Sequence, residues 1–147
     1  MPRNPSSTTH RGWAWDNDDQ RLEVVVNGVE IGGFDSDGFS ISGRGTVIQQ
    51  TDKTTGVTIN NRAGTITMDN ADITAGSEVG FVVTNSVVGV NDVIIVSIGA
   101  AAATASAYTT TVNEVADGSF VITISNATGG TLSEAILLNF VVIKVAA

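Results

Sequence analysis

The chain is short, acidic and free of cysteine, and these properties exclude several classes of protein. Its 147 residues carry 15 acidic and 7 basic side chains, a net charge of −8. This balance argues against binding to nucleic acid or an anionic membrane, because phosphate recognition depends on clustered Lys and Arg. Without Cys, neither a disulfide framework nor a thiolate metal site is available. Residues 1–13 are polar, so we expect no secretory signal, and no run reaches the roughly 18 apolar residues of a transmembrane helix.

The N-terminal part of the chain predicts an extended arm followed by a β-hairpin. Apolar and polar residues alternate over Arg21–Val26, and Asn27-Gly28 follows before a second apolar segment. Asn-Gly between alternating runs is a strong hairpin signal, because both residues tolerate the positive φ angles of a type I′ turn. Asp35–Gly38 predicts the next turn, which leads to a short strand with Phe39 and Ile41. We therefore assign residues 1–44 to an arm and hairpin.

Residues 45–147 predict a separate all-β domain. β-branched residues dominate it, and turn residues such as Asp117-Gly118 divide it into short segments. Eight short strands at this spacing favour a β-sandwich, with a jelly-roll-like arrangement as the particular form. A weak internal repeat, in which a Gly-Ser pair, an apolar run and an Asn recur at 76–85 and 118–126, fits two matched halves. The expected strands are 46–50, 57–60, 64–68, 79–85, 93–98, 107–113, 119–125 and 135–145.

The last expected strand is apolar on both faces, which predicts a subunit interface. One face carries Ile136, Leu138, Phe140 and Val142, and the other carries Leu137, Val141 and Ile143. One face of a two-layer sandwich normally meets water, so the second apolar face needs another cover. We expect Leu137, Val141 and Ile143 to form an interface with another subunit. Burial under a long loop of the same chain is the alternative.

Catalytic and metal-binding chemistry is poorly represented, so we expect neither an enzyme nor a cofactor. The only histidine, His10, lies in a polar segment with no residue to orient it, and no catalytic motif is present. Two acidic segments, Asp16–Asp19 and Asp35–Gly38, resemble cation ligand sets but lack the distal Glu of an EF-hand. Asp and Asn also suit turns, because their side chains bond the local backbone. We therefore predict turns at both segments and no metal site.

Two tryptophans stand out near the N-terminus as candidate anchors for a partner. Trp13 and Trp15 are the only tryptophans, and they point to one side if the segment is extended. Arg3 and Arg11 occur in the same stretch, and Trp and Arg are favoured anchors at interfaces. We predict that these four residues bind a partner. Alternatively, the tryptophans only cover the apolar face of the hairpin.

Several blocks of the sequence resemble structural proteins of tailed bacteriophages. The segments WDN at 15–17, RLEV at 21–24 and NG at 27–28 are similar to an N-terminal hairpin found in phage head and fibre proteins. A second set is similar to a compact β-domain of phage heads and fibre tips, usually a trimer: DKTTGVTIN at 52–60, GTITM at 64–68, VTNS at 83–86, DVI at 92–94 and GGTLSEA at 129–135. No shaft repeat separates the two sets, which favours a capsid clamp over a fibre.

The resemblance implies a capsid decoration, or cement, protein on the outer surface of the virion. Its expected partners are the major capsid protein and further copies of itself, with no nucleic acid or membrane. Residues 1–44 would dock on the capsid and residues 45–147 would trimerise. A phage fibre or a receptor- or carbohydrate-binding β-module is the alternative. That module would need exposed aromatic residues in the β-domain, where only Tyr108 lies off the expected apolar strand faces.

Overall fold

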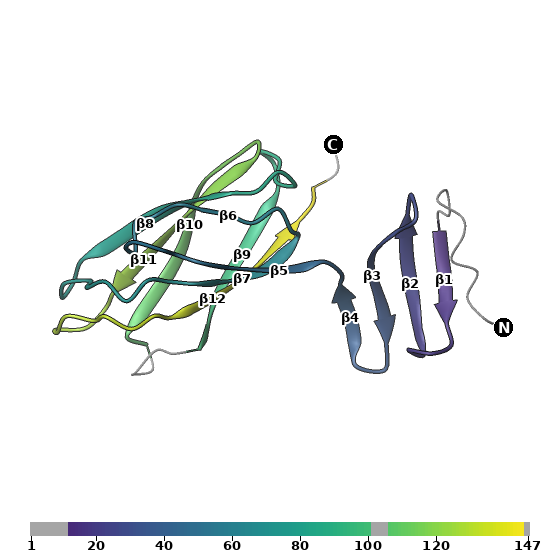
Figure 1. The fold of residues 1–147 in the computed structure, drawn as a ribbon, viewed down its shortest axis with the longest axis horizontal. Coiled ribbons are helices and arrows are strands. Elements are labelled where there is room, and N and C mark those ends of the chain that lie inside the picture. The colour runs from purple at the N-terminus through teal and green to yellow at the C-terminus, as the bar shows by residue number, and fades with distance from the viewer. Residues whose placement is uncertain (1–11, 101–105, 146–147) are drawn as a thin grey trace. The chain divides into compact units, whose positions relative to one another are not determined.

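A computed structural model describes residues 12–100 and 106–145 of the chain, and within these ranges it contains strands and no helix (Figure 1). The strands form three four-stranded sheets. The chain divides into two compact units, Met1–Gly43 and Arg44–Ala147, one residue from the division expected between 44 and 45. We call them the N-terminal and C-terminal units. No helix among the described residues is long and apolar enough to cross a membrane.

The N-terminal unit is a four-stranded antiparallel meander. Its strands are β1 (Gly12–Asp16), β2 (Arg21–Val26), β3 (Val29–Asp35) and β4 (Gly38–Ile41), and they pair in chain order. The predicted hairpin is confirmed as β2–β3, and its turn residues Asn27 and Gly28 have φ angles of 52° and 77°. The expected extended arm is wrong for residues 12–16. They pair with β2 along their whole length, from Gly12 opposite Val25 to Asp16 opposite Arg21.

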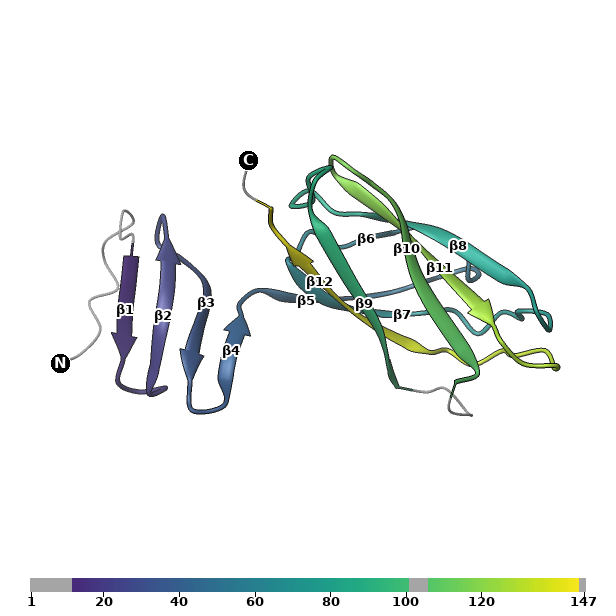
Figure 2. The ribbon, with the colours of Figure 1, turned by 180° about the vertical axis from the view of Figure 1, so that it is seen from behind.

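The C-terminal unit consists of two four-stranded sheets around one hydrophobic core. One sheet has the order β5-β7-β12-β9 and the other β10-β11-β8-β6. Phe120 of β11 contacts Phe140 of β12, with ring centroids 5.7 Å apart, so the contact joins the two sheets. This arrangement, seen from behind in Figure 2, is consistent with the expected β-sandwich. The strands are β5 (Arg44–Ile48), β6 (Val57–Thr58), β7 (Ala63–Thr67), β8 (Glu78–Thr84), β9 (Val93–Ala100), β10 (Tyr108–Ala116), β11 (Ser119–Asn126) and β12 (Leu137–Ile143).

The expected jelly-roll-like arrangement is not confirmed, because two of the strand pairings are parallel. β5 pairs with β7 in parallel, and β6 pairs with β8 in parallel. A jelly roll is built from antiparallel Greek keys. Here successive strands from β5 to β8 alternate between the two sheets. Each sheet therefore receives its next strand in the same direction as the one before, β7 beside β5 and β8 beside β6.

The weak internal repeat corresponds to a shared local structure at the ends of β8 and β11. These strands pair antiparallel; buried Asn85 follows β8, and buried Asn126 is the last residue of β11. The backbone N–H of Asn85 donates to Gly118 O at 2.8 Å, and that of Asn126 donates to Ser77 O at 2.9 Å. Each Asn side chain also accepts a hydrogen bond from the N–H two residues ahead and donates to a distant carbonyl. The repeat therefore satisfies buried backbone groups at two equivalent positions.

A buried polar cluster fixes the loop between β5 and β6. The amide of Gln49 donates to the carbonyls of Lys53 and Thr55 and accepts from the N–H of Asp69. The ammonium group of Lys53 donates to the carbonyls of Asp69 and Glu134. Burial lowers the pKa of Lys53, although the nearby acidic side chains oppose this effect. The cluster ties three separate segments of the C-terminal unit together.

Candidate docking surfaces

The N-terminal unit presents a continuous apolar surface on one side of its sheet. Directly paired residues point to the same face, so the strand register gives two rows across the four strands. The first row is Trp15, Leu22, Phe34 and Phe39, and the second is Trp13, Val24, Gly32 and Ile41. We call the seven apolar side chains of these rows the aromatic face.

The aromatic face is exposed to a degree that is unusual for side chains of this size. Trp13 and Trp15 are 61% and 58% exposed, and Phe34 and Phe39 are 46% and 62% exposed. The rings contact one another, with centroids 6.4 Å apart for Trp13 and Phe34 and 5.1 Å apart for Phe34 and Phe39. A one-sided apolar sheet is stable when a second layer covers that side. The face therefore has the character of a docking surface.

The opposite side of this sheet is mainly polar, apart from buried Val25, and is held together by its own contacts. Arg21 pairs with Glu30 at 2.6 Å and donates to the hydroxyl of Ser40 at 3.0 Å. Ser42 also donates to the Glu30 carboxylate. Gly33 leaves the space that Arg21 occupies, since a Cβ there would lie 2.7 Å from its Nη2. The two sides of the meander thus differ in chemistry, and the apolar side is the one available to a partner.

The two acidic segments form turns, as the sequence predicts. The Asp16 side chain accepts hydrogen bonds from the N–H groups of Asp18 and Asp19. The Asp35 side chain accepts from those of Asp37 and Gly38. Among the described residues, no group of three acidic or histidine side chains is placed to hold a metal ion. The carboxylates of Asp16 and Asp35 are engaged by the backbone of their own turns.

The structure brings together two of the four predicted partner-binding residues. Trp13 and Trp15 lie in β1, on the aromatic face, whereas Arg3 and Arg11 lie outside the described residues. The alternative, that the tryptophans cover the apolar face of the hairpin, is correct in placement, yet both side chains stay more than half exposed. Sequence reasoning missed Phe34 as part of this surface. Extending the alternation of β2 into β3 would have found it, because Phe34 lies opposite Leu22.

A second apolar surface lies on the outer side of the sheet that contains β12. Leu138, Phe140 and Val142 point into the core and are buried, so the intervening residues face outward. Val141 pairs with Ile95 of β9, and Ile143 pairs with Val93. Val93 and Ile95 are each 51% exposed and Ile143 is 45% exposed. We call Val93, Ile95, Val141 and Ile143 the β9/β12 patch.

The predicted interface residues do not form one continuous surface. A polar row crosses the sheet at Asn139, whose side chain accepts hydrogen bonds from Thr65 and Arg44. Leu137 lies beyond this row, separated from Val141 and Ile143. The alternative of burial under a loop is wrong for Ile143, which stays exposed, while Leu137 and Val141 are half-buried. Val93 and Ile95 come from the expected strand 93–98, which is also apolar on both faces, and the strand register places them beside Ile143 and Val141.

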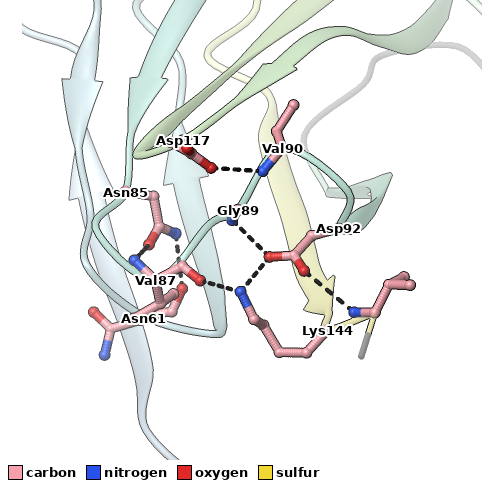
Figure 3. Close-up of polar contacts among 9 residues, drawn as sticks. Asn61, Asn85, Val87, Gly89, Val90, Asp92, Asp117 and Lys144 are labelled. Carbon is pink, nitrogen blue, oxygen red and sulfur yellow. Dashed lines mark hydrogen bonds and ion pairs between the residues drawn. The ribbon is translucent and has the colours of Figure 1, made fainter. Parts of the chain in front are cut away.

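A polar network anchors the end of the β9/β12 patch (Figure 3). Asp92, just before Val93, pairs with Lys144, just after Ile143. The Asp92 carboxylate also accepts hydrogen bonds from the backbone N–H groups of Gly89 and Val145. The hydrogen bond from Lys144 and then that from Gly89 hold the pKa of Asp92 below its ordinary value. The ion pair fixes the paired ends of β9 and β12, and with them the exposed apolar side chains.

The outer face of the other sheet is mainly polar, apart from Val82 and its partner Val121, and carries no aromatic residue among those described. Ser119, Thr123 and Ser125 point outward from β11, in alternation with the buried Phe120, Ile122 and Ile124. The expectation that Tyr108 is the free aromatic residue is wrong. Its ring is buried and its hydroxyl donates to the Glu134 carboxylate. Burial and this hydrogen bond raise the pKa of Tyr108 to about 12.

Comparisons with protein-family models, with curated proteins and with solved structures find no match for the chain. The aromatic face and the β9/β12 patch therefore carry the functional argument on their own geometry.

Proposed function

We propose that the protein is a structural component of a tailed-phage particle that decorates and cements the capsid from its outer surface. The aromatic face docks on the major capsid protein, and the β9/β12 patch joins copies of the chain into a homotrimer. The role is mechanical and requires no catalysis or cofactor. The observation that supports it best is the row of exposed aromatic side chains on a unit separate from the core domain.

Division of the chain into two units suits a protein that holds neighbouring capsid subunits together. The cluster of buried hydrophobic side chains that forms the main core lies entirely in the C-terminal unit, so that unit has its own source of stability. The N-terminal unit is then free to supply contacts rather than core packing. Three such units on one trimer make docking multivalent, which gains roughly 10²–10⁴ in avidity without stronger individual contacts.

The alternative is a phage fibre or a receptor- or carbohydrate-binding module. In the C-terminal unit all four aromatic residues, Phe81, Tyr108, Phe120 and Phe140, are buried, so none of them can stack on a sugar. The aromatic face of the N-terminal unit is the one described surface that favours this alternative, because exposed Trp and Phe rings can stack on the apolar faces of sugar rings. The two functions are separable by experiment.

The test is a binding assay on phage capsids that lack this protein. We expect the wild-type chain to bind in a saturable manner, with tryptophan emission shifting to the blue as Trp13 and Trp15 become buried. A glycan array and host cells serve as the second arm. Binding to glycans or cells without binding to capsids would reject decoration in favour of the receptor-binding alternative.

A further inference from the structure

We propose that the aromatic face, with the acidic turns at its edge, recognises an apolar protein surface bordered by Lys and Arg side chains. This inference deepens the proposed function, because it names the chemistry of the surface on which the N-terminal unit docks. It follows from the strand register, which brings apolar and acidic residues to one end of the meander.

The acidic turns and the most aromatic row lie at the same end of the sheet. In a meander, the β1–β2 and β3–β4 turns are at one end and the β2–β3 turn is at the other (Figure 1). The row Trp15, Leu22, Phe34 and Phe39 is the row next to these two turns, since Asp16 pairs with Arg21 and Asp35 with Gly38. A partner covering this row therefore also meets the turns.

The turns concentrate acidic side chains at one end of the meander. Five aspartates gather there: Asp16, Asp18, Asp19, Asp35 and Asp37. The nearest base, Arg21, is already paired with Glu30 on the polar side. Asp18, Asp19 and Asp37 are exposed, whereas the carboxylates of Asp16 and Asp35 accept the hydrogen bonds that form the turns. The aromatic face itself carries no charge.

Charge selects the occupant of this surface. Residues 1–43 contain seven acidic and three basic side chains, a net charge of −4, so two copies brought face to face would repel each other. Anionic lipids and nucleic acids would be repelled for the same reason. A protein surface with an apolar centre and a basic rim satisfies both parts of the site. Rim charges of this kind set the partner and its orientation and speed association.

The experiment uses the full-length protein and synthetic amphipathic peptides that contain no tryptophan. Trp13 and Trp15 are the only tryptophans of the chain, so tryptophan emission reports on this face alone. We expect a helix of Leu and Lys to bind and to shift the emission to the blue. A matched helix of Leu and Glu, or a peptide of Ser and Lys with the same charge, should bind at least about tenfold more weakly.

A pair of charge variants tests the role of the acidic turns. The triple variant D18N/D19N/D37N removes three exposed charges and keeps the two aspartates that form the turns. It should weaken binding of the Leu and Lys peptide by about tenfold, and added salt should reduce this difference. The control variant D72N/E78Q/E114Q makes the same change of net charge on the C-terminal unit. It should alter the affinity by less than about twofold.

Each outcome supports or overturns the inference. Equal binding of the Leu and Glu helix, equal weakening by the control variant, or no emission shift would overturn it. Sedimentation showing that W13A/W15A lowers the oligomer mass would also overturn it, because a second copy would then be the occupant. Capsid binding separates the two claims. Binding to the Leu and Lys peptide without binding to capsids would support the inference and reject the proposed function. Binding to capsids without selective binding to this peptide would support the proposed function and reject the inference.

Discussion

Replacing Ile95 by Asp should dissociate the proposed trimer and leave the fold of each chain intact. Ile95 points outward from β9, lies opposite Val141 and is half exposed. Its side chain contributes to the β9/β12 patch and not to the core. A carboxylate placed here is harmless in a monomer, where water reaches it. In a trimer it would have to be desolvated within an apolar contact.

The magnitude follows from the area that the monomer leaves exposed. Complete burial of a Val or Ile side chain stabilises by about 1.5–3 kcal/mol. Val93, Ile95 and Ile143 are each about half exposed, so association can add about 0.8–1.5 kcal/mol for each, or roughly 2–4.5 kcal/mol per protomer. Ile95→Asp removes about a third of this and adds a desolvation cost of several kcal/mol. The association constant should fall at least about a hundredfold.

Sedimentation over a series of protein concentrations that extends to the millimolar range measures the effect. The wild-type chain should sediment as a trimer and Ile95→Asp as a monomer with the same far-UV circular dichroism. Val82→Asp is the matched control, since Val82 is similarly exposed, at 47%, on the outer side of the other sheet. It should remain a trimer. A wild-type monomer, or an Ile95→Asp protein of unchanged mass, would refute the reasoning.

Three further predictions concern stability and ionisation. Phe120→Ala removes a fully buried ring and should lower the free energy of unfolding by about 3–5 kcal/mol in urea titrations followed by circular dichroism, whereas Phe39→Ala, at an exposed site, should cost less than about 1 kcal/mol. Tyr108 is the only tyrosine, so its ultraviolet absorbance should titrate near pH 12 in the native protein. A midpoint near that of an ordinary phenol, about pH 10, in a folded protein would contradict its burial. The lowered pKa of Asp92 means that its stabilisation is present at neutral pH and is lost as the pH falls through the folded-state value. Asp92→Asn should therefore lower the melting temperature at neutral pH and reduce its acid dependence, and equal acid curves for the two proteins would contradict this.

Much of the local structure could be predicted from the sequence because turn residues specify it directly. Asn27-Gly28 fixes the β2–β3 turn through the positive φ angles that both residues adopt. Alternation in β11 correctly separates buried Phe120 from outward-facing Ser119. β1 was missed as a strand because its short sequence, GWAWD, has no alternation of its own strong enough to predict pairing. The position of β1 depends on backbone pairing with the free edge of β2.

The order of the strands and the makeup of the surfaces could not be predicted in the same way. β5 pairs with β7 in parallel because the chain passes through β6 of the other sheet between them, and no turn residue encodes this path. The β9/β12 patch joins residues about 50 positions apart in the chain through their register. Leu137 was grouped with Val141 by periodicity alone, which ignores the polar row that Asn139 forms with neighbouring strands. Alternation within a strand determines which side chains share a face, and the pairing register between strands determines which of them are neighbours on that face.

The aromatic face is the central claim, and occupancy of capsids by the W13A/W15A variant tests it most directly. Particles lacking the protein would be incubated with wild-type or variant chains, and bound copies counted by quantitative gel analysis. We expect the variant to bind at least about a hundredfold more weakly, because two anchoring tryptophans are lost from each chain of a multivalent trimer. Its C-terminal unit should unfold as in the wild type. Wild-type occupancy by the folded variant would show that docking uses another surface.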